Sequence, residues 1–411
     1  MNGVLSISVR RQWTSKSRSW KRWLFPIYAL TVIFSELISY CYLILEDVDA
    51  ESKIMQYIFA ILTGIALFLL LKEVSNKLLM STWKVLGVLI LVPVLYFTTS
   101  AFYDTPPENY TSYILRYCSI CISACIVGIY MAYHPCQYEI DRLLPFFVIP
   151  IGIILGSVCM DSIANMKYIK SESGLNYQNV AYGMAELYAY SCYYVFFSKA
   201  AKEHRYLRLS MFAMIFYFAA FCFVAGGRGA VVFLCFISVI IIWLLYKQLK
   251  INKILFVLSL LFCVLVFIGV SSYFDIWNTV GFARIAERLD DASSRVGIYD
   301  KSIEVFLDSY GLGCGLGSIW WTVGIYSHNI FLDLLAEIGI IGCILVCSVF
   351  FFMLKKMFNL VSRDKSYLFI LLCFLKTIIV TIFSTYWISS YQIWLLFGFV
   401  FSLNSFKYKF T

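Results

Sequence analysis

Charged residues are scarce in this chain of 411 amino acids. Only 14% of the residues are Asp, Glu, Lys or Arg, whereas 61% are hydrophobic and the mean hydropathy is +0.81. An ordinary globular protein has about a quarter of its residues charged. The strand-type alternation of an outer-membrane barrel is also absent. These deficits exclude an ordinary soluble domain and indicate helices that cross a membrane.

Metal-binding patterns are missing as well. The chain has 14 cysteines but only three histidines, and none of the cysteines has the context of a zinc ligand. Cys118 and Cys121 have the spacing of a ligand pair, but they lie inside an apolar run with no histidine nearby. Cys314 is the only cysteine well inside the long outer loop described below. We therefore expect no metal, no cofactor and no disulfide framework, and interpret the cysteines as small buried hydrophobes.

Hydropathy predicts an all-α polytopic membrane protein with about twelve transmembrane helices, because a helix needs roughly 20 apolar residues to cross the hydrocarbon core. Residues 1–411 then form a single integral membrane domain. The basic segment 1–23 leads into an apolar run too long for a cleavable signal peptide, so the first span is expected to stay attached. The predicted spans are 24–45, 54–71, 85–103, 113–133, 143–160, 180–198, 209–225, 229–246, 254–274, 330–354, 366–383 and 389–406.

The distribution of basic residues predicts the orientation. With the N-terminus inside, 23 of the 33 Lys and Arg residues fall in inner segments and 8 in outer segments. This asymmetry favours both termini inside and places segment 1–23 in the cytoplasm. It also explains the net charge of +9 without a nucleic-acid partner. Only Arg116 and Lys376 lie within spans.

One outer loop, residues 275–329, is much longer than the others. A loop of this length in a compact protein is usually functional or disordered. Ser293 or Ser294 could cap a helix, and the apolar residues that follow recur at helical spacing: Val296, Tyr299, Ile303 and Phe306. The pattern predicts a partly helical periplasmic loop with an amphipathic helix in the outer membrane interface.

Among the three histidines, His328 alone faces outward, where this loop re-enters the membrane. His134 and His204 fall in inner loops and are interpreted as solvated side chains. An imidazole suits proton abstraction near neutral pH, because its unperturbed pKa is about 6.5. The alternative for His328 is a packed or capping histidine.

Outward arginines are candidates for binding phosphate, because a guanidinium keeps its charge and binds oxygens bidentately. Arg228 lies in the tight turn Gly226–Gly229. Arg284, Arg288 and Arg295 share one face if a single helix carries all three. The alternative for these three is pairing with nearby acids or lipid headgroups.

Two further segments could hold ligands but are interpreted otherwise. Residues 311–317, Gly-Leu-Gly-Cys-Gly-Leu-Gly, lack the strand and the lysine of a nucleotide-binding loop, so we expect a backbone turn packed under the loop. Asp290 and Asp291 could hold a metal, but adjacent acids point in different directions on a helix and are interpreted as solvated. Acidic or basic residues within or near spans are expected to face the bundle interior: Glu36, Glu186, Asp333, Glu337 and Lys376.

Together these residues resemble the O-antigen polymerase and O-antigen ligase superfamily. The clearest element is His328-Asn329 followed by Gly339 and Gly342, within SHNIFLDLLAEIGIIG. The segment 293–321 is similar to the family's arginine-bearing loop and Gly-x-Gly turn. GGRGAVVFL resembles an earlier family segment, with Gly227 where serine is common, and GLNYQNVAYGMAE is similar to an outer-loop motif of many polymerases. The resemblance covers roughly Gly174 to Ile388.

The resemblance implies a metal-independent glycosyltransferase with a GT-C-type membrane fold. Its donor would be an oligosaccharide on undecaprenyl pyrophosphate at the periplasmic face of the bacterial inner membrane. His328 would be the general base, and Arg228, Arg295 and Arg288 would hold the pyrophosphate. Asn329, Tyr177 and Gln178 would bind the glycan. The implied partners are this lipid-linked oligosaccharide, the bilayer and a chain-length regulator protein.

Three functions fit this sequence. The preferred one is an O-antigen (surface polysaccharide) polymerase, favoured by the twelve spans and the NYQN stretch. The second is an O-antigen ligase, which takes the same donor but uses lipid A-core as acceptor. The third is a polysaccharide flippase or transporter, which the lack of an apparent repeat disfavours.

Overall fold

The structure is a computed structural model, and every element in its described part is helical. It describes the following residues: 21–46, 76–103, 107–133, 136–165, 169, 176–249, 257–258, 261, 264–265, 268–269, 271–273, 275–279, 281–283 and 292–403.

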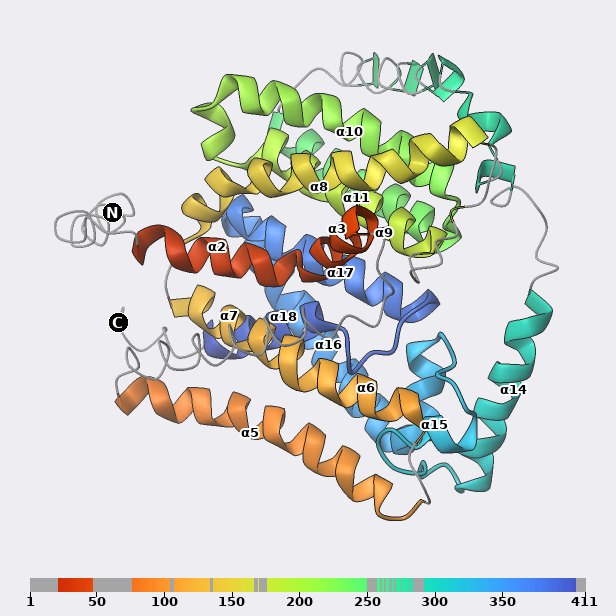
Figure 1. Cartoon of the computed structure of the whole chain (residues 1–411). Helices are drawn as coiled ribbons and strands as arrows, with labels where there is room; N and C mark the ends of the chain where they lie inside the picture. The colour runs from red at the N-terminus through yellow and green to blue at the C-terminus, as the bar shows by residue number, and fades with distance from the viewer. Residues whose placement is uncertain are drawn as a thin grey trace.

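Most of the long helices run side by side as a bundle (Figure 1). Within the described residues, six helices are long and apolar enough to cross a membrane, or seven if one bent pair is counted as a span. The bundle helices are α2 (Lys21–Ile33), α3 (Ser35–Glu46), α5 (Asn76–Ser100), α6 (Glu108–Arg116), α7 (Ile122–Tyr133), α8 (Gln137–Asn165), α9 (Tyr177–Phe197), α10 (Arg205–Ala225), α11 (Arg228–Leu249), α16 (Ile330–Arg363), α17 (Leu368–Phe383) and α18 (Tyr391–Leu403).

Helices or helix pairs occupy each predicted span except two. The span 54–71 lies outside the described residues, and so does most of 254–274. The single span expected over 24–45 is instead two helices, α2 and α3, which are bent by 72° at Phe34. The carbonyl of Ile33, at this break, accepts a 2.7 Å hydrogen bond from the Tyr391 hydroxyl. This bond gives a buried backbone group at the break a partner, which a helix end inside a bundle requires.

Small residues allow a close contact between two helices. Helix α18 packs along α7, and a Cβ added to Gly398 would lie 2.2 Å from the Cys125 carbonyl oxygen. One added to Gly128 would lie 2.0 Å from the Leu395 carbonyl oxygen. Glycine on both helices therefore lets the two backbones touch, as in many membrane helix pairs.

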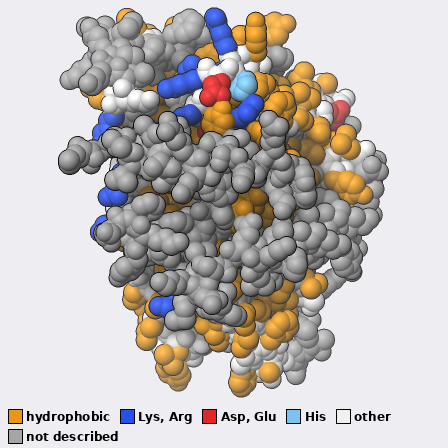
Figure 2. All heavy atoms as spheres, turned by 90° about the vertical axis from the view of Figure 1, so that its left-hand side faces the viewer, with side chains coloured by type: hydrophobic (Ala, Val, Ile, Leu, Met, Phe, Trp, Pro, Cys, Tyr) orange, Lys and Arg blue, Asp and Glu red, His pale blue; other side chains and the backbone are white. Residues whose placement is uncertain are grey.

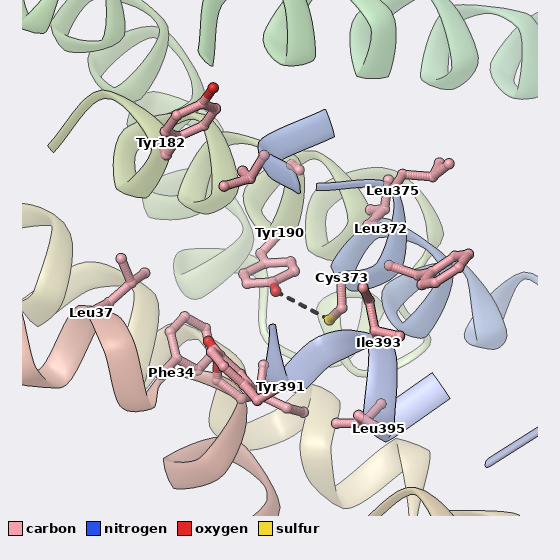
Figure 3. Close-up of a cluster of buried hydrophobic side chains, with 14 of the residues drawn as sticks. Phe34, Leu37, Tyr182, Tyr190, Leu372, Cys373, Leu375, Tyr391, Ile393 and Leu395 are labelled. Carbon is pink, nitrogen blue, oxygen red and sulfur yellow. Dashed lines mark hydrogen bonds between the residues drawn. The ribbon is translucent and has the colours of Figure 1, made fainter. Parts of the chain in front are cut away.

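The core lies between α3, α9, α17 and α18. Figure 3 shows Phe34, Tyr190, Cys373 and Tyr391 pointing toward one another, all buried. The Tyr190 hydroxyl and the Cys373 thiol are 3.1 Å apart. The hydroxyls of Tyr190 and Tyr391 donate to the Glu186 carboxylate and the Ile33 carbonyl, which offsets the cost of removing them from water.

The two ends of the bundle differ. Lys and Arg side chains gather around a histidine on the face that carries the start of α2 (Figure 2). Lys202, Arg205 and Arg208 are exposed near the start of α10. At the opposite end, α14 (Ala292–Asp308) crosses the ends of the bundle helices (Figure 1).

Helix α14 confirms the predicted helix of the long loop. It begins at Ala292, so Ser293 and Ser294 lie in its first turn and do not precede it. Val296 and Ile303 remain 50% and 44% exposed. Their apolar surface is therefore available to a membrane interface, where the sequence places this helix.

Candidate active site

The C-terminal end of α17 organises the site. The Arg295 guanidinium donates a hydrogen bond from Nη1 to the Phe383 carbonyl at 3.1 Å. The next carbonyl, of Ser384, accepts from the Tyr326 hydroxyl at 2.9 Å and lies 3.2 Å from His328 Nδ1. Carbonyls at a helix C-terminus lack helical partners and carry partial negative charge. Two adjacent carbonyls thus bring together an arginine and a histidine that are far apart in sequence.

The hydrogen bond to Ser384 fixes the form of the His328 imidazole. A carbonyl oxygen can only accept, so Nδ1 carries the proton in the neutral ring and Nε2 keeps its lone pair. Burial lowers the pKa of His328 below its ordinary value, the Ser384 carbonyl raises it, and the positive charge of Arg295 lowers it further. At neutral pH the ring is therefore unprotonated at Nε2, the state that a general base requires.

The backbone at His328 is strained and locally braced. Its φ is +59°, in the left-handed region that non-glycine residues rarely adopt. The buried carboxylate of Asp333 accepts a 2.7 Å bond from the Ser327 amide, and the Ser327 hydroxyl bonds the Asn329 carbonyl at 2.8 Å. Strain of this kind costs on the order of 1–3 kcal/mol and persists where surrounding contacts over-determine it. Asp333 and Ser327 supply those contacts.

Asn329 has a structural task in this turn. It is the N-cap of α16, and its side-chain oxygen accepts a 3.0 Å bond from the Phe331 amide. This cap satisfies one of the amides that the first helical turn leaves without a partner. Sugar binding by Asn329 stays a prediction.

Tyr177 and Gln178 reach the same place from α9. The Ser384 hydroxyl donates to Gln178 Oε1 at 2.9 Å, and Gln178 Nε2 donates to the Tyr177 hydroxyl at 2.9 Å. Because Ser384 also binds His328 through its carbonyl, the start of α9 is joined to the histidine by a single residue. The structure thus brings together the polymerase-like segment and the histidine motif.

Arg228 begins α11 beside these residues. A Cβ on Gly227 would lie 2.6 Å from the Ala181 Cβ and 3.9 Å from the Gln178 Cα. One on Gly229 would meet the Tyr182 hydroxyl at 2.0 Å and the Phe383 Cβ at 3.3 Å. The glycines on both sides of Arg228 therefore allow this turn to pack against α9 and the end of α17. Arg288, Arg284, Asp290 and Asp291 lie outside the described residues.

The glycine-rich segment 311–317 packs against α16, the helix that begins just after His328. All four of its glycines have positive φ, between 76° and 102°. Cys314 and Gly315 donate backbone bonds to the carbonyls of Ala336 and Glu337, and Ile340 donates to Gly311. These bonds bridge α16 where Gly339 interrupts its helical conformation with φ 67° and ψ −173°. The segment is thus the packed backbone turn that the sequence predicts.

Sequence reasoning missed three members of the site: Ser384, Tyr326 and the bracing role of Asp333. Tyr326 packs on the His328 ring with centroids 4.3 Å apart. The sequence indicates Asp333 only as a costly acid near a span. Ser384 has no sequence signal, since its contribution to His328 is a backbone carbonyl.

A comparison with known families bears on this same stretch of chain. Residues 212–347 match the family model described as O-antigen ligase. The match includes Arg228, Arg295, His328 and Gly339, and it confirms the resemblance to the O-antigen polymerase and ligase superfamily. Members of this family are glycosyltransferase-like enzymes. No curated protein matches the chain.

Proposed function

We propose that this protein is a surface-polysaccharide polymerase of the O-antigen type. It transfers a growing glycan from undecaprenyl pyrophosphate to a new lipid-linked repeat unit on the periplasmic face of the bacterial inner membrane. The observation that carries the proposal is the His328 imidazole held through Nδ1 by Ser384, with Arg295 on the adjacent carbonyl.

The chemistry follows from this geometry. Nε2 of His328 takes the proton of an acceptor hydroxyl as its oxygen attacks the anomeric carbon of the donor. The bond between that carbon and the pyrophosphate breaks, and the proton then leaves His328 for solvent. Arg228 and Arg295 bind the pyrophosphate and stabilise the charge that grows on it, which preorganised cations do without reorganising. Arg288 is a further candidate for this task.

The contact between Gln178 and Ser384 favours a polymerase. Gln178 belongs to the NYQN stretch that is similar to a polymerase motif, and it contacts Ser384, the residue that holds the histidine. In this proposal, Gln178 and Tyr177 position the sugars of the acceptor. The second candidate, an O-antigen ligase, is favoured by the description of the matching family model.

Lipopolysaccharide ladders from a strain without the gene distinguish these functions. Loss of a polymerase leaves lipid A-core bearing a single repeat unit. Loss of a ligase leaves lipid A-core without O-antigen and accumulates lipid-linked chains. Units stranded on the inner face would instead indicate a flippase, and either of the last two patterns would refute the polymerase.

Arg295→Gln is expected to shift the pH dependence of transfer as well as slow it. The arginine's charge lowers the pKa of His328, so its removal raises that pKa, and the neutral base then forms only at higher pH. The rising limb of kcat/KM against pH should move to higher pH. Lys301→Gln, on the same helix and exposed, should leave the profile unchanged. An unshifted profile in Arg295→Gln would show that Arg295 does not influence the pKa of the base.

A further inference from the structure

A cluster of charged side chains lies in the membrane part of the bundle. Lys376 on α17 binds Glu186 Oε2 at 3.1 Å and Glu36 Oε2 at 3.3 Å. Arg116 Nη2 lies 3.4 Å from Glu36 Oε1. Ionisable groups are costly at this depth and usually mark a functional pathway. The four side chains come from α3, α6, α9 and α17 and form a charge-balanced cluster.

Burial decreases across the cluster toward Arg116. The side chains of Glu186 and Lys376 are 1% and 5% exposed, whereas those of Glu36 and Arg116 are 22% and 34% exposed. The inner pair is therefore closed off, and the outer pair is partly exposed. Arg116 is the more exposed of the two cations in the cluster.

The ion pair between Glu36 and Arg116 is weak. Its carboxylate is shared among three donors, because Tyr40 also donates to Oε1 at 2.8 Å and Lys376 occupies Oε2. Within the described residues, Arg116 has one contact with an acid, from Nη2 at 3.4 Å. A guanidinium held through one terminal nitrogen can use its other terminal N–H groups to bind a dianion without leaving Glu36 unpaired.

Two irregularities of the backbone lie next to the Glu36–Arg116 pair. Glu36 lies in the first turn of α3, just after the 72° break with α2. Arg116 ends α6 and is followed by a π-helical turn, η1 (Tyr117–Cys121). In membrane proteins, broken helices and π-bulges commonly line binding sites. Phe34 and Leu37, on either side of Glu36, anchor this break in the core (Figure 3).

Two tyrosines, Tyr113 and Tyr326, connect the segment of Arg116 with His328. Tyr326 packs on His328 and is 6.1 Å from Tyr113, three residues before Arg116. Arg116 is within electrostatic range of both tyrosines. Arg116 is therefore linked to the candidate base through Tyr113 and Tyr326, whereas Arg295 binds the end of α17.

We propose that Arg116 binds a second polyprenyl diphosphate, that of the acceptor, while Arg228 and Arg295 hold the diphosphate of the donor. The inference rests on the proposed polymerase function, in which both substrates are lipid-linked. A diphosphate fits Arg116 better than a sugar acid does, because a polyprenyl carrier keeps its diphosphate at the membrane whereas the glycan extends into water. The repeat unit then spans Tyr113 and Tyr326 to bring its terminal hydroxyl to His328.

Binding stoichiometry tests the proposal. Native mass spectrometry of the full-length protein in nanodiscs, with sugar-free undecaprenyl diphosphate as probe, should detect two bound lipids. Arg116→Gln should leave one, and Arg295→Gln should leave the other. Glu36→Gln/Arg116→Gln removes both partners and avoids an unpaired carboxylate, so it should also leave one if Arg116→Gln fails to fold. Cys118→Ala, exposed on the same segment, should retain two.

Kinetics provide a second measurement. Arg116→Gln should raise the KM for the acceptor at least tenfold and change kcat by less than threefold. A single bound lipid in the unmodified protein, or two in the Arg116 variants, would overturn the second site. Neither outcome would contradict the proposed glycosyl transfer, which the His328 variants test separately.

Discussion

Replacing His328 by alanine is expected to lower the rate of glycan transfer by about 10²–10⁴-fold, the usual contribution of a general base. The loss should appear in kcat, because the imidazole acts on the proton in the transition state and contributes little to substrate affinity. Transfer can be measured with purified protein and lipid-linked repeat units, or as chain length in a complemented deletion strain.

Two variants make this result interpretable. His328→Asn preserves the turn, because asparagine tolerates the left-handed conformation that His328 adopts. It should therefore fold normally and still lose activity. His204→Ala removes a histidine that precedes α10 at the other end of the bundle and should keep full activity. Normal chain length in His328→Asn would eliminate the general-base role.

Gly339→Ala should cause a large loss of stability. The φ and ψ of Gly339 are 67° and −173°, a conformation almost restricted to glycine that costs about 1–3 kcal/mol for other residues. The added Cβ would also lie 2.4 Å from the Gly311 oxygen and the Leu312 carbonyl carbon. Backbone overlap of this kind adds about 1–3 kcal/mol. We expect a total loss of about 2–6 kcal/mol.

Gly297→Ala is the matched control for this change. It adds the same methyl group to α14, where nothing lies within 4 Å of the new Cβ. Alanine is favoured over glycine inside a helix by up to about 1 kcal/mol, so stability should stay equal or rise. The measurement is the thermal unfolding midpoint in detergent together with the yield of folded protein. Equal stability of the two variants would show that the break at Gly339 is not required.

The sequence predicts much of this arrangement through long-range patterns. Apolar runs place the helices because burial in lipid dictates their length, and the resemblance to the O-antigen family joins His328, Arg228 and Arg295 in one site. Glycines also predict unusual backbone conformations, since Gly339 belongs to the motif and segment 311–317 contains four glycines. What such patterns do not reveal is which backbone atoms meet.

The contributions that escape prediction are those without a side-chain signature. The break at Phe34 has neither proline nor glycine in it, and the carbonyl of Ile33 at this break accepts its hydrogen bond from Tyr391, far away in the chain. The partners of Glu36 and Lys376 likewise come from different helices, so no spacing reports them. Asn329 shows the opposite difficulty: a polar residue beside a candidate base also serves as a helix cap, and only the backbone geometry reveals this second task.

The two carbonyls at the end of α17 have a consequence for mutagenesis. They belong to the main chain, so no substitution at Phe383 or Ser384 deletes the acceptor of Arg295 or of His328. An alanine scan across these positions would therefore report mild effects at the centre of the site and overlook it. Only a change to the main chain itself, such as an ester in place of the amide or a shifted helix end, would reveal what those oxygens contribute.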